Sequence, residues 1–438
     1  MTPSAVLGLI SFAVMIVLIV LGLPIAVSMF VVAIAGFAIT GGAAMIGQQL
    51  SSGIFSLSAS YTFAVVPLFM IVGILAGETG IAAGAYTSAR KWVGRHRGGL
   101  LHTTIVANAL FGACSGISVA SNAVFCKIAA PELRKAGYDE SLSLGCISAA
   151  GSLSSLIPPS IPIITVCILA DISIGTALIC GTAAGILTMI IMMLVIKGTQ
   201  LIHPAKVPGP TEEDRNVTVR DRLRSLKLLL PILALFVLIV GGSFFGWFSA
   251  TVGGAVATVA IIIYALVRRM PLRQLGRAIC DGASSFAGIY LMIMAGSLFS
   301  RYITFTGLAK QLANVIANLA LSPILIFLVV VVFYLFCGCF IAVMPIIIIT
   351  VPVLLPVLTQ LGFDPYALAI CLVLLCELGN ITPPVGNSVF TTAIITGESP
   401  TKIFKGVMPF FVAELAACIL FGLVPQVITW LPAVLGML

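Results

Sequence analysis

Charged side chains are scarce in this sequence. Of its 438 residues, only 8% are Asp, Glu, Lys or Arg, whereas a soluble globular protein carries roughly 25%. Hydrophobic residues make up 60% and recur in long runs from one end of the chain to the other. This composition excludes a soluble enzyme, and it predicts a chain for which the lipid bilayer is the main solvent.

Groups that could support catalysis or bind a transition metal are also few. The chain has three His and eleven Cys, and no two Cys have CxxC spacing. Cys337 and Cys339 are too close in sequence for a normal tetrahedral metal pair. No nucleophile with a base is recognisable at membrane depth, so we expect no enzyme and no cofactor, and an intramembrane enzyme is disfavoured. The basic run 90–97 is better explained by acidic lipid than by nucleic acid.

Eight apolar runs fit conventional spans of about 20 residues. They cover residues 4–21, 24–40, 62–80, 174–196, 227–245, 248–267, 280–299 and 407–430. Four other segments are interrupted midway. Segments 99–130 and 321–358 contain small residues near their centres, and segments 142–170 and 366–396 each contain a Pro-Pro pair.

The positive charges indicate how the interrupted segments are arranged. If 99–130 and 321–358 are re-entrant hairpins and the Pro-Pro segments cross the membrane, all but two of the 22 Lys and Arg fall on one side. The positive-inside rule makes that side the cytoplasm. Both termini are then predicted to lie outside, and the hydrophilic linker 198–225 inside.

The four interrupted segments form an internal repeat. Each half has a hairpin, with its tip expected at 114–118 or 336–339, followed by a span with a Pro-Pro break. The tips are 338 − 116 = 222 residues apart, and the Pro-Pro pairs are 383 − 158 = 225 apart. Five crossings separate the hairpins, so the second copy is inverted. We therefore predict an all-α polytopic membrane protein with inverted-topology repeats, as in secondary transporters.

This repeat divides the chain into five parts. They are N-terminal scaffold helices (1–98), a first transport repeat (99–197, with hairpin 99–130, broken helix 142–170 and helix 174–196), a cytoplasmic linker (198–225), further scaffold helices (226–320), and a second transport repeat (321–438, with hairpin 321–358, broken helix 366–396 and last helix 407–430).

A Pro-Pro pair unwinds a helix because proline removes a backbone hydrogen bond and clashes with the preceding turn. Within hydrocarbon, the freed carbonyls need protein, water or an ion as a partner. Carbonyl and hydroxyl oxygens suit Na⁺, and the helix N-terminus that follows a break favours an anionic substrate. The alternative is that Pro158-Pro159 and Pro383-Pro384 only kink packed spans, which matching positions in both repeats disfavour.

Four motifs together resemble the large membrane subunit of tripartite ATP-independent periplasmic (TRAP) transporters. They are Leu21-Gly22-Leu23-Pro24-Ile25-Ala26, Lys135-Ala136-Gly137-Tyr138-Asp139, Ser154-Ser155-Leu156-Ile157-Pro158-Pro159-Ser160-Ile161-Pro162 and Ile381-Thr382-Pro383-Pro384-Val385-Gly386. The resemblance runs from about residue 21 to residue 432.

The resemblance implies a Na⁺-coupled, elevator-type importer of small organic acids, of the C4-dicarboxylate, sialic acid or sugar acid class. It implies two partners: a small four-helix membrane subunit as a separate chain, and a periplasmic substrate-binding protein. The location would be a bacterial inner membrane, with both termini periplasmic. A stand-alone Na⁺/dicarboxylate symporter of related architecture remains an alternative.

The resemblance also implies two sodium sites, largely built from backbone oxygens. The first would use Ser115, Ile117, Ser154, Ile157 and Pro159, and the second Cys337, Cys339, Gly379, Thr382 and Pro384. Many family members carry an acidic residue at the positions of Ser121 and Ala342. Both are absent here, so no proton-relay role is carried over to them.

Candidate substrate contacts are polar residues near the breaks and one outer cation. They are Arg301, Ser118, Ser160 and Asn387. An arginine at a cavity rim can bind a carboxylate bidentately, although Arg301 could equally anchor the chain at the interface. Glu377 lies deep in a crossing span and must be protonated, paired or facing water. The sequence leaves open whether Glu377 has a functional role or only caps the broken backbone as a hydrogen-bond partner.

Overall fold

The computed structural model describes residues 2–55, 59, 61–242, 247–318 and 322–437. Within these ranges every regular element is a helix. The N-terminal half contains α1 (Pro3–Val20), α2 (Ile25–Gln48), η1 (Gln49–Ile54), η2 (Tyr61–Ala64), α4 (Val65–Glu78), α5 (Ile81–Val93), α6 (Gly99–Ser115), α7 (Ser118–Lys135), α8 (Glu140–Ala150), α9 (Leu153–Leu156), α10 (Ile161–Ala170), α11 (Ile174–Ile202), η3 (Pro204–Lys206) and α12 (Glu212–Arg215). The C-terminal half contains α13 (Val219–Phe236), η4 (Val237–Gly241), α15 (Ala250–Val267), α16 (Leu272–Thr306), α17 (Leu308–Asn318), α18 (Pro323–Phe340), α19 (Val343–Gln360), α20 (Pro365–Asn380), α21 (Asn387–Thr396), α22 (Pro400–Leu423) and α23 (Gln426–Val434).

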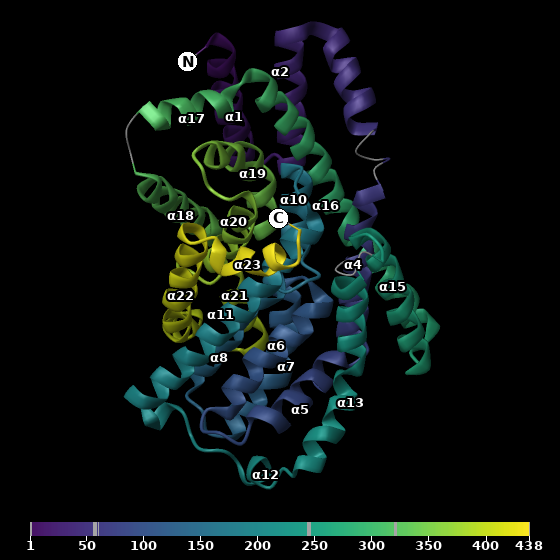
Figure 1. Cartoon of the computed structure of the whole chain (residues 1–438), viewed down its shortest axis with the longest axis vertical. Coiled ribbons are helices and arrows are strands. Elements are labelled where there is room, and N and C mark those ends of the chain that lie inside the picture. The colour runs from purple at the N-terminus through teal and green to yellow at the C-terminus, as the bar shows by residue number, and fades with distance from the viewer. Residues whose placement is uncertain (1, 56–58, 60, 243–246, 319–321, 438) are drawn as a thin grey trace.

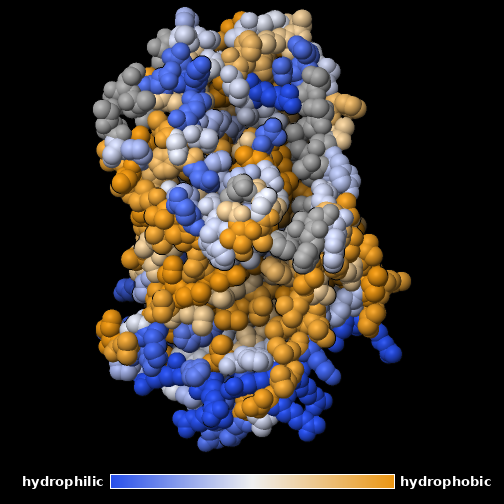
Figure 2. Space-filling model, in the orientation of Figure 1, coloured by the Kyte–Doolittle hydropathy of each residue, from blue (hydrophilic) through white to orange (hydrophobic). Residues whose placement is uncertain are grey.

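The helices have the length and composition of membrane spans. Among the described residues, 7 helices are long and apolar enough to cross a bilayer, or up to 9 if each sharply bent pair counts as one span. An apolar belt crosses the middle of the molecule, and hydrophilic residues gather at both ends (Figure 2). The N-terminus and the linker around α12 lie at opposite ends of the long axis (Figure 1). The predicted all-α polytopic fold is confirmed.

All eight predicted conventional spans overlap helices, but several bounds differ, as for 24–40 against α2 (Ile25–Gln48) and 280–299 against α16 (Leu272–Thr306). We expected 407–430, but α22 begins at Pro400 and ends at Leu423. Proline disfavours helical geometry in the residue before it, and Val424 before Pro425 has φ −127° and ψ 72°. The C-terminal part of the predicted span therefore belongs to α23. The ends of two other predictions, at residues 243–245 and 321, lie outside the described residues.

The first predicted hairpin consists of α6 and α7, which run antiparallel. The Ser121 hydroxyl donates to Asn108 Oδ1 at 2.8 Å, and the Phe111 and Phe125 rings lie 5.9 Å apart. Gly116 ends α6 with φ 63°, a left-handed conformation that glycine adopts without a Cβ penalty. The first tip, residues 116–117, therefore lies where the sequence predicts it.

The second tip lies later than predicted. α18 continues through Cys337 and Cys339 to Phe340, and the helix is interrupted only at residues 341–342, which are extended. Tyr334 and Thr350 then hydrogen-bond across this second tip. Its offset from the first tip is 341 − 116 = 225, the same as that of the Pro-Pro pairs. The repeat is therefore more regular than the sequence motifs indicated.

Both Pro-Pro segments are broken helices, as predicted. In the first repeat the break at residues 157–160 separates α9 from α10, and the two halves are bent by 43°. In the second, the break at residues 381–386 separates α20 from α21. The peptide bond within each proline pair is cis. We call these segments the first break and the second break.

The two repeats pack through glycines. A Cβ at Gly406 in α22 would overlap the carbonyl oxygen of Ser141 in α8, and a Cβ at Gly145 would overlap the backbone of Gly406. Small residues at membrane helix contacts let backbones approach closely and gain van der Waals energy. The α8–α22 contact therefore joins the first repeat to the second with almost no side chain between them.

We predict that Gly406→Ala separates α8 from α22 and destabilises the protein by about 1–3 kcal/mol, as overpacked interiors do. The measurement is the melting temperature of the purified protein in detergent. Gly276→Ala is the matched control, because Gly276 in α16 has no neighbouring heavy atom within 4 Å of an added Cβ. Equal melting temperatures for Gly406→Ala and Gly276→Ala would contradict the prediction.

Candidate functional site

The first tip contacts the first break directly. A Cβ at Gly116 would overlap the carbonyl oxygen of Pro159, and one at Gly112 would lie 2.8 Å from the Cα of Ser154. Only glycine at these two positions allows the tip and the break to approach so closely. The structure therefore brings the residues predicted for the first sodium site to one junction, at the tip between α6 and α7 and the break between α9 and α10.

Two hydroxyls at this junction have no hydrogen-bond partner among the described residues. Ser115 is 2% exposed and Ser154 is 0% exposed, and the Oγ atom of each is unpaired. Ile157 and Pro159 are buried as well, while Ile117 is half-buried. Because burying a polar group without a partner is costly, these oxygens are suited to a ligand.

The second tip contacts the second break in a similar way. A Cβ at Gly338 would lie 2.7 Å from the Cα of Gly379. The Gly386 N–H donates to the carbonyl oxygen of Cys339 at 3.2 Å, and the Cys339 thiol donates to the carbonyl oxygen of Pro383 at 3.2 Å. The residues predicted for the second sodium site are thus also brought together, with Cys337 in the last turns of α18.

The two junctions differ in exposure and pairing. The Thr382 hydroxyl donates to the Leu378 carbonyl oxygen at 2.6 Å, whereas Ser115 and Ser154 are unpaired. Every residue of the first break is buried, but Pro384 is exposed and lines a surface hollow that also contains Lys405. The first junction is therefore enclosed and the second is open on one side.

A cavity of about 160 Å³ lies between the two tips and the two broken helices. Its lining comes from both repeats and from α16. The lining residues are Gly116, Ile117, Ser118, Val119, Ser155, Ile161, Pro162, Ile289, Ala342, Val343, Met344, Glu377, Asn380 and Asn387. We call this space the central cavity.

Four helices begin at the central cavity. They are α7, α10, α19 and α21, whose first residues belong to its lining. No side chain caps the N-terminus of α7, α19 or α21, whereas Ser160 caps α10 by accepting from the Ile163 N–H at 3.2 Å. Free N–H groups and aligned peptide dipoles make helix N-termini attractive to anions. The four N-termini therefore favour a carboxylate in the cavity, whereas an ionised Glu377 in the same lining would oppose one.

Two of the four predicted substrate contacts line the central cavity, namely Ser118 and Asn387. Ser160 is buried beside it, where its hydroxyl donates to the carbonyl oxygen of Ser155 and caps α10. Arg301 is exposed on α16 and is not among the lining residues. The structure thus does not bring Arg301 together with the other three, and its role remains a prediction.

Glu377 acquires a definite partner in the structure. It is 2% exposed, and its Oε1 accepts a hydrogen bond of 2.6 Å from the hydroxyl of Ser155 in the other repeat. The sequence indicated neither this pairing nor the place of Ser155 in the cavity lining. The available signal was the proximity of Ser155 and Glu377 each to a Pro-Pro pair, which does not identify partners across repeats.

Glu414 in α22 is a second buried carboxylate. It is 0% exposed, and neither of its carboxylate oxygens has a hydrogen-bond partner among the described residues. It does not line the central cavity. The hydroxyl of Ser152 in the first repeat lies beside this carboxylate and is the polar group nearest to it that the structure indicates.

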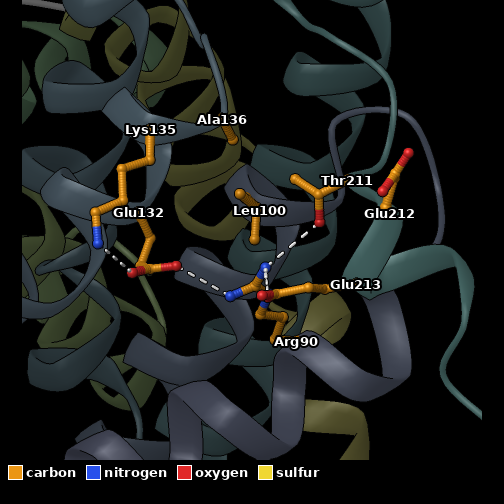
Figure 3. Close-up of a pocket in the computed structure, with 8 residues that line it drawn as sticks. All are labelled: Arg90, Leu100, Glu132, Lys135, Ala136, Thr211, Glu212 and Glu213. Atoms are coloured by element: carbon orange, nitrogen blue, oxygen red, sulfur yellow. Dashed lines mark hydrogen bonds and ion pairs between the residues drawn. The ribbon is translucent and has the colours of Figure 1, made fainter.

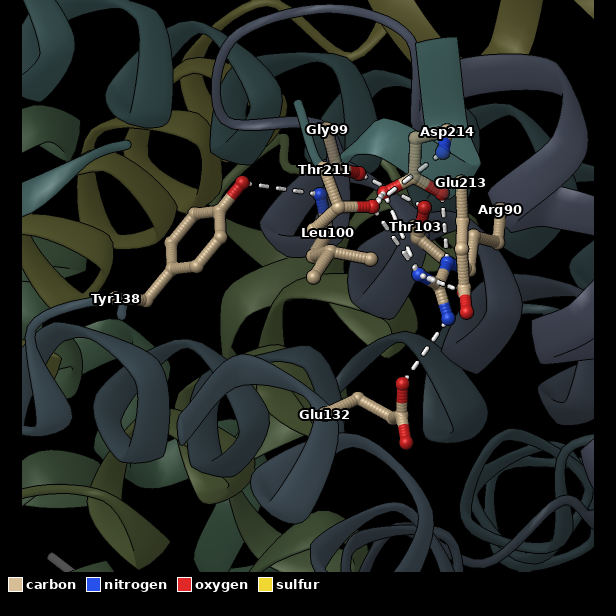
Figure 4. A network of polar contacts seen from close by, with 9 residues as sticks. All are labelled: Arg90, Gly99, Leu100, Thr103, Glu132, Tyr138, Thr211, Glu213 and Asp214. Carbon is tan, nitrogen blue, oxygen red and sulfur yellow. Dashed lines mark hydrogen bonds and ion pairs between the residues drawn. The ribbon is translucent and has the colours of Figure 1, made fainter. Parts of the chain in front are cut away.

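Another hollow, formed where α5, α7 and the linker meet, contains a cluster of charges (Figure 3). Arg90 donates to Asp214 Oδ1 at 2.7 Å, to Glu132 Oε2 at 3.0 Å and to Glu213 Oε2 at 3.2 Å. Figure 4 shows the guanidinium between these carboxylates and Thr211. Because the cation is already surrounded by protein acids, we interpret this cluster as a structural tie between the first hairpin and the linker.

The fold and the central cavity define a class, a multi-pass membrane transporter built from two inverted repeats. Within that class, residues 12–427 match the family described as "Tripartite ATP-independent periplasmic transporter, DctM component". The chain belongs to this family, and the resemblance drawn from the motifs is confirmed.

Known relatives cover nearly the whole chain. It is 31% identical over 392 residues to the C4-dicarboxylate TRAP transporter large permease protein DctM of Pseudomonas aeruginosa, covering 89% of this chain and 90% of that protein. It is 27% identical over 429 residues to the sialic acid TRAP transporter permease protein SiaT of Haemophilus influenzae, covering 97% of this chain and 68% of that protein. Among solved structures, the YdaH transporter of Alcanivorax borkumensis shares the fold, with a TM-score of 0.65 at 16% identity over 87% of this chain and 88% of that chain.

We predict that Arg90→Ala destabilises the protein on the order of 3 kcal/mol, because removing one partner of a buried pair leaves a charge unpaired. Asp214 is only 3% exposed, so its carboxylate has little water to replace the guanidinium. Arg134→Ala is the control, since that side chain is 60% exposed and exposed pairs contribute about 1 kcal/mol or less. Melting temperatures in detergent test this, and equal losses in both variants would contradict it.

Proposed function

We propose that this chain is the large membrane subunit of a TRAP transporter that imports small organic acids together with Na⁺. It acts with a small membrane subunit and a soluble substrate-binding protein in a bacterial inner membrane, with both of its termini on the periplasmic side. The hairpins and broken helices carry substrate and ions across as one elevator-like unit.

The convergence of four helix N-termini on the central cavity is the observation that supports an anionic substrate. Three of those N-termini are uncapped by side chains, so their N–H groups are available to a carboxylate. The cavity volume of about 160 Å³ is below the roughly 300–1,000 Å³ of pockets for drug-sized ligands. A small acid that contacts Ser118 and Asn387, with Ser160 and Arg301 as further predicted contacts, fits this space.

The unpaired hydroxyls of Ser115 and Ser154 support sodium as the coupling ion. Together with main-chain oxygens freed at the first break, they form a set of hard oxygen donors in a buried place. Oxygen ligands of this kind suit small hard cations. The second sodium ion would be held by the corresponding group at the second break, including Thr382.

The proposed function predicts sodium-dependent uptake in liposomes. The large and small subunits are reconstituted together, and radiolabelled C4-dicarboxylate and sialic acid are offered with the cognate binding protein under an inward Na⁺ gradient. Uptake should fall at least about tenfold when choline replaces Na⁺, since the gradient supplies the driving force. Uptake without the binding protein would favour the stand-alone symporter, and uptake equal in choline would contradict sodium coupling.

We further predict that Ser115→Ala combined with Thr382→Ala reduces uptake and raises the half-saturating Na⁺ concentration by about tenfold, because each change removes one ligand oxygen. Thr103→Ala is the control, since Thr103 is a buried hydroxyl near the opposite end of α6, about 18 Å from Ser115 along the helix. Unchanged Na⁺ dependence in the double variant would count against these ligands.

A further inference from the structure

We propose that Glu377 is a positioning residue that couples the two sodium sites, by linking the broken helix of one repeat to the break of the other. This inference rests on the proposed function, because it concerns how the two ions act together. It assigns a role to Glu377, for which the sequence left two interpretations open.

The hydrogen bond between Ser155 and Glu377, which we call the bridge, connects residues close to both predicted sodium sites. Ser155 immediately follows Ser154, a predicted ligand of the first site, and Glu377 precedes Gly379, a predicted ligand of the second, by two residues. The hydroxyl of Ser155 donates to Glu377 Oε1 at 2.6 Å, and both residues are at most 2% exposed. Because this hydrogen bond joins the two broken helices directly, a shift of either break acts on the other.

Glu377 also lies close to the first tip. Ser118, the first residue of α7, and Asn380 lie beside the same carboxylate, and all three residues line the central cavity. The carboxylate is carried by α20 of the second repeat but contacts the tip and the break of the first. It is therefore placed to sense whether the first junction has closed around an ion.

The bridge is not repeated by the internal symmetry. An offset of 225 residues relates Glu377 to Ser152 and Ser155 to Asn380. The Ser152 hydroxyl makes no hydrogen bond with Asn380 and lies beside the buried carboxylate of Glu414 in α22, so the symmetric contact is not made there. A single bridge of this kind gives the two ion sites a direct connection rather than two independent ones.

Other hydrogen bonds between the repeats do not involve residues of either break. The Asn122 amide donates to the carbonyl oxygen of Ser388 at 2.7 Å, and the hydroxyls of Ser148 and Thr392 lie 2.8 Å apart. These contacts hold the repeats together without involving a predicted sodium ligand. They provide a comparison for a contact that only stabilises the assembly.

Linkage makes the expected coupling reciprocal. If sodium at the first site orders Ser154, the neighbouring Ser155 is fixed in the position that supports Glu377 and hence the end of α20. Binding at the second site then becomes tighter, and the first site must benefit from the second by the same factor. Sodium binding should therefore be cooperative in the wild-type chain.

The test measures equilibrium binding of radioactive sodium alone to the purified full chain with its small subunit, at constant ionic strength with choline chloride. Glu377→Leu and Ser155→Ala each remove one end of the bridge. Glu377→Gln is the conservative variant, because an amide oxygen can still accept from Ser155. Thr392→Val is the matched control, because it removes a cross-repeat hydrogen bond that involves no residue of either break.

We expect the Hill coefficient to fall to about one in Glu377→Leu and in Ser155→Ala, with the half-saturating Na⁺ concentration raised about tenfold. The double variant should be no worse than Glu377→Leu alone, since Glu377→Leu already removes the hydrogen bond that Ser155→Ala removes. Glu377→Gln should retain most of the cooperativity, and Thr392→Val all of it.

Three results would overturn the coupling alone. They are an unchanged Hill coefficient in Ser155→Ala, additive losses of sodium affinity in the double variant, or an equal fall of the Hill coefficient in Thr392→Val. Absence of sodium binding to the wild-type chain would overturn the proposed sodium coupling and this inference together. Melting temperatures measured in parallel identify any variant that fails to fold. If one of the two variants does not fold, the Hill coefficient must still fall to about one in the other variant for the proposal to stand.

Discussion

The structure depends on the cost of leaving main-chain hydrogen-bonding groups unpaired away from water. A broken helix at membrane depth is tolerated only where protein or a ligand replaces the missing bonds. Here each break is contacted by the tip of the hairpin in its own repeat, although the second break remains exposed on one side, and α20 is buried at every residue from Ala367 to Asn380. The hairpins, the glycine contacts and the position of the central cavity all follow from the need to enclose these two interruptions.

Local chemistry made much of the fold predictable from the sequence. Each Pro-Pro pair breaks its helix, whereas single prolines such as Pro352 and Pro356 lie inside the continuous helix α19. Both breaks were therefore located by the Pro-Pro pairs, and Gly116 correctly located the first tip. Gly338 misled for a physical reason. It remains helical, and its missing side chain serves the approach of Gly379 rather than a turn. A glycine required by a tertiary contact looks the same in sequence as one required by a turn.

The candidate site was predictable only in part. Ser115 and Ser154 were predicted from the family resemblance and Asn387 from its place beside the second break, and the roles of all three stay predictions. The bond between Ser155 and Glu377, and the meeting of four helix N-termini, depend on how two distant repeats pack, which no local pattern records. The repeats also differ in exposure, with the first break buried and Pro384 of the second exposed. Internal symmetry therefore predicts the architecture better than it predicts the chemistry.

The contact between Gly338 and Gly379 restricts the kinds of motion open to the second hairpin. Two main chains meet there with no side chain between them. The Cys339 carbonyl oxygen accepts a hydrogen bond from the Gly386 N–H across the same junction. If the second hairpin moved away from α20 by itself, those peptide groups would be exposed to hydrocarbon. The proposed elevator-like movement is consistent with this contact, because the second hairpin and α20 would then move as one rigid unit and the barrier to opening would lie at the outer edge of that unit.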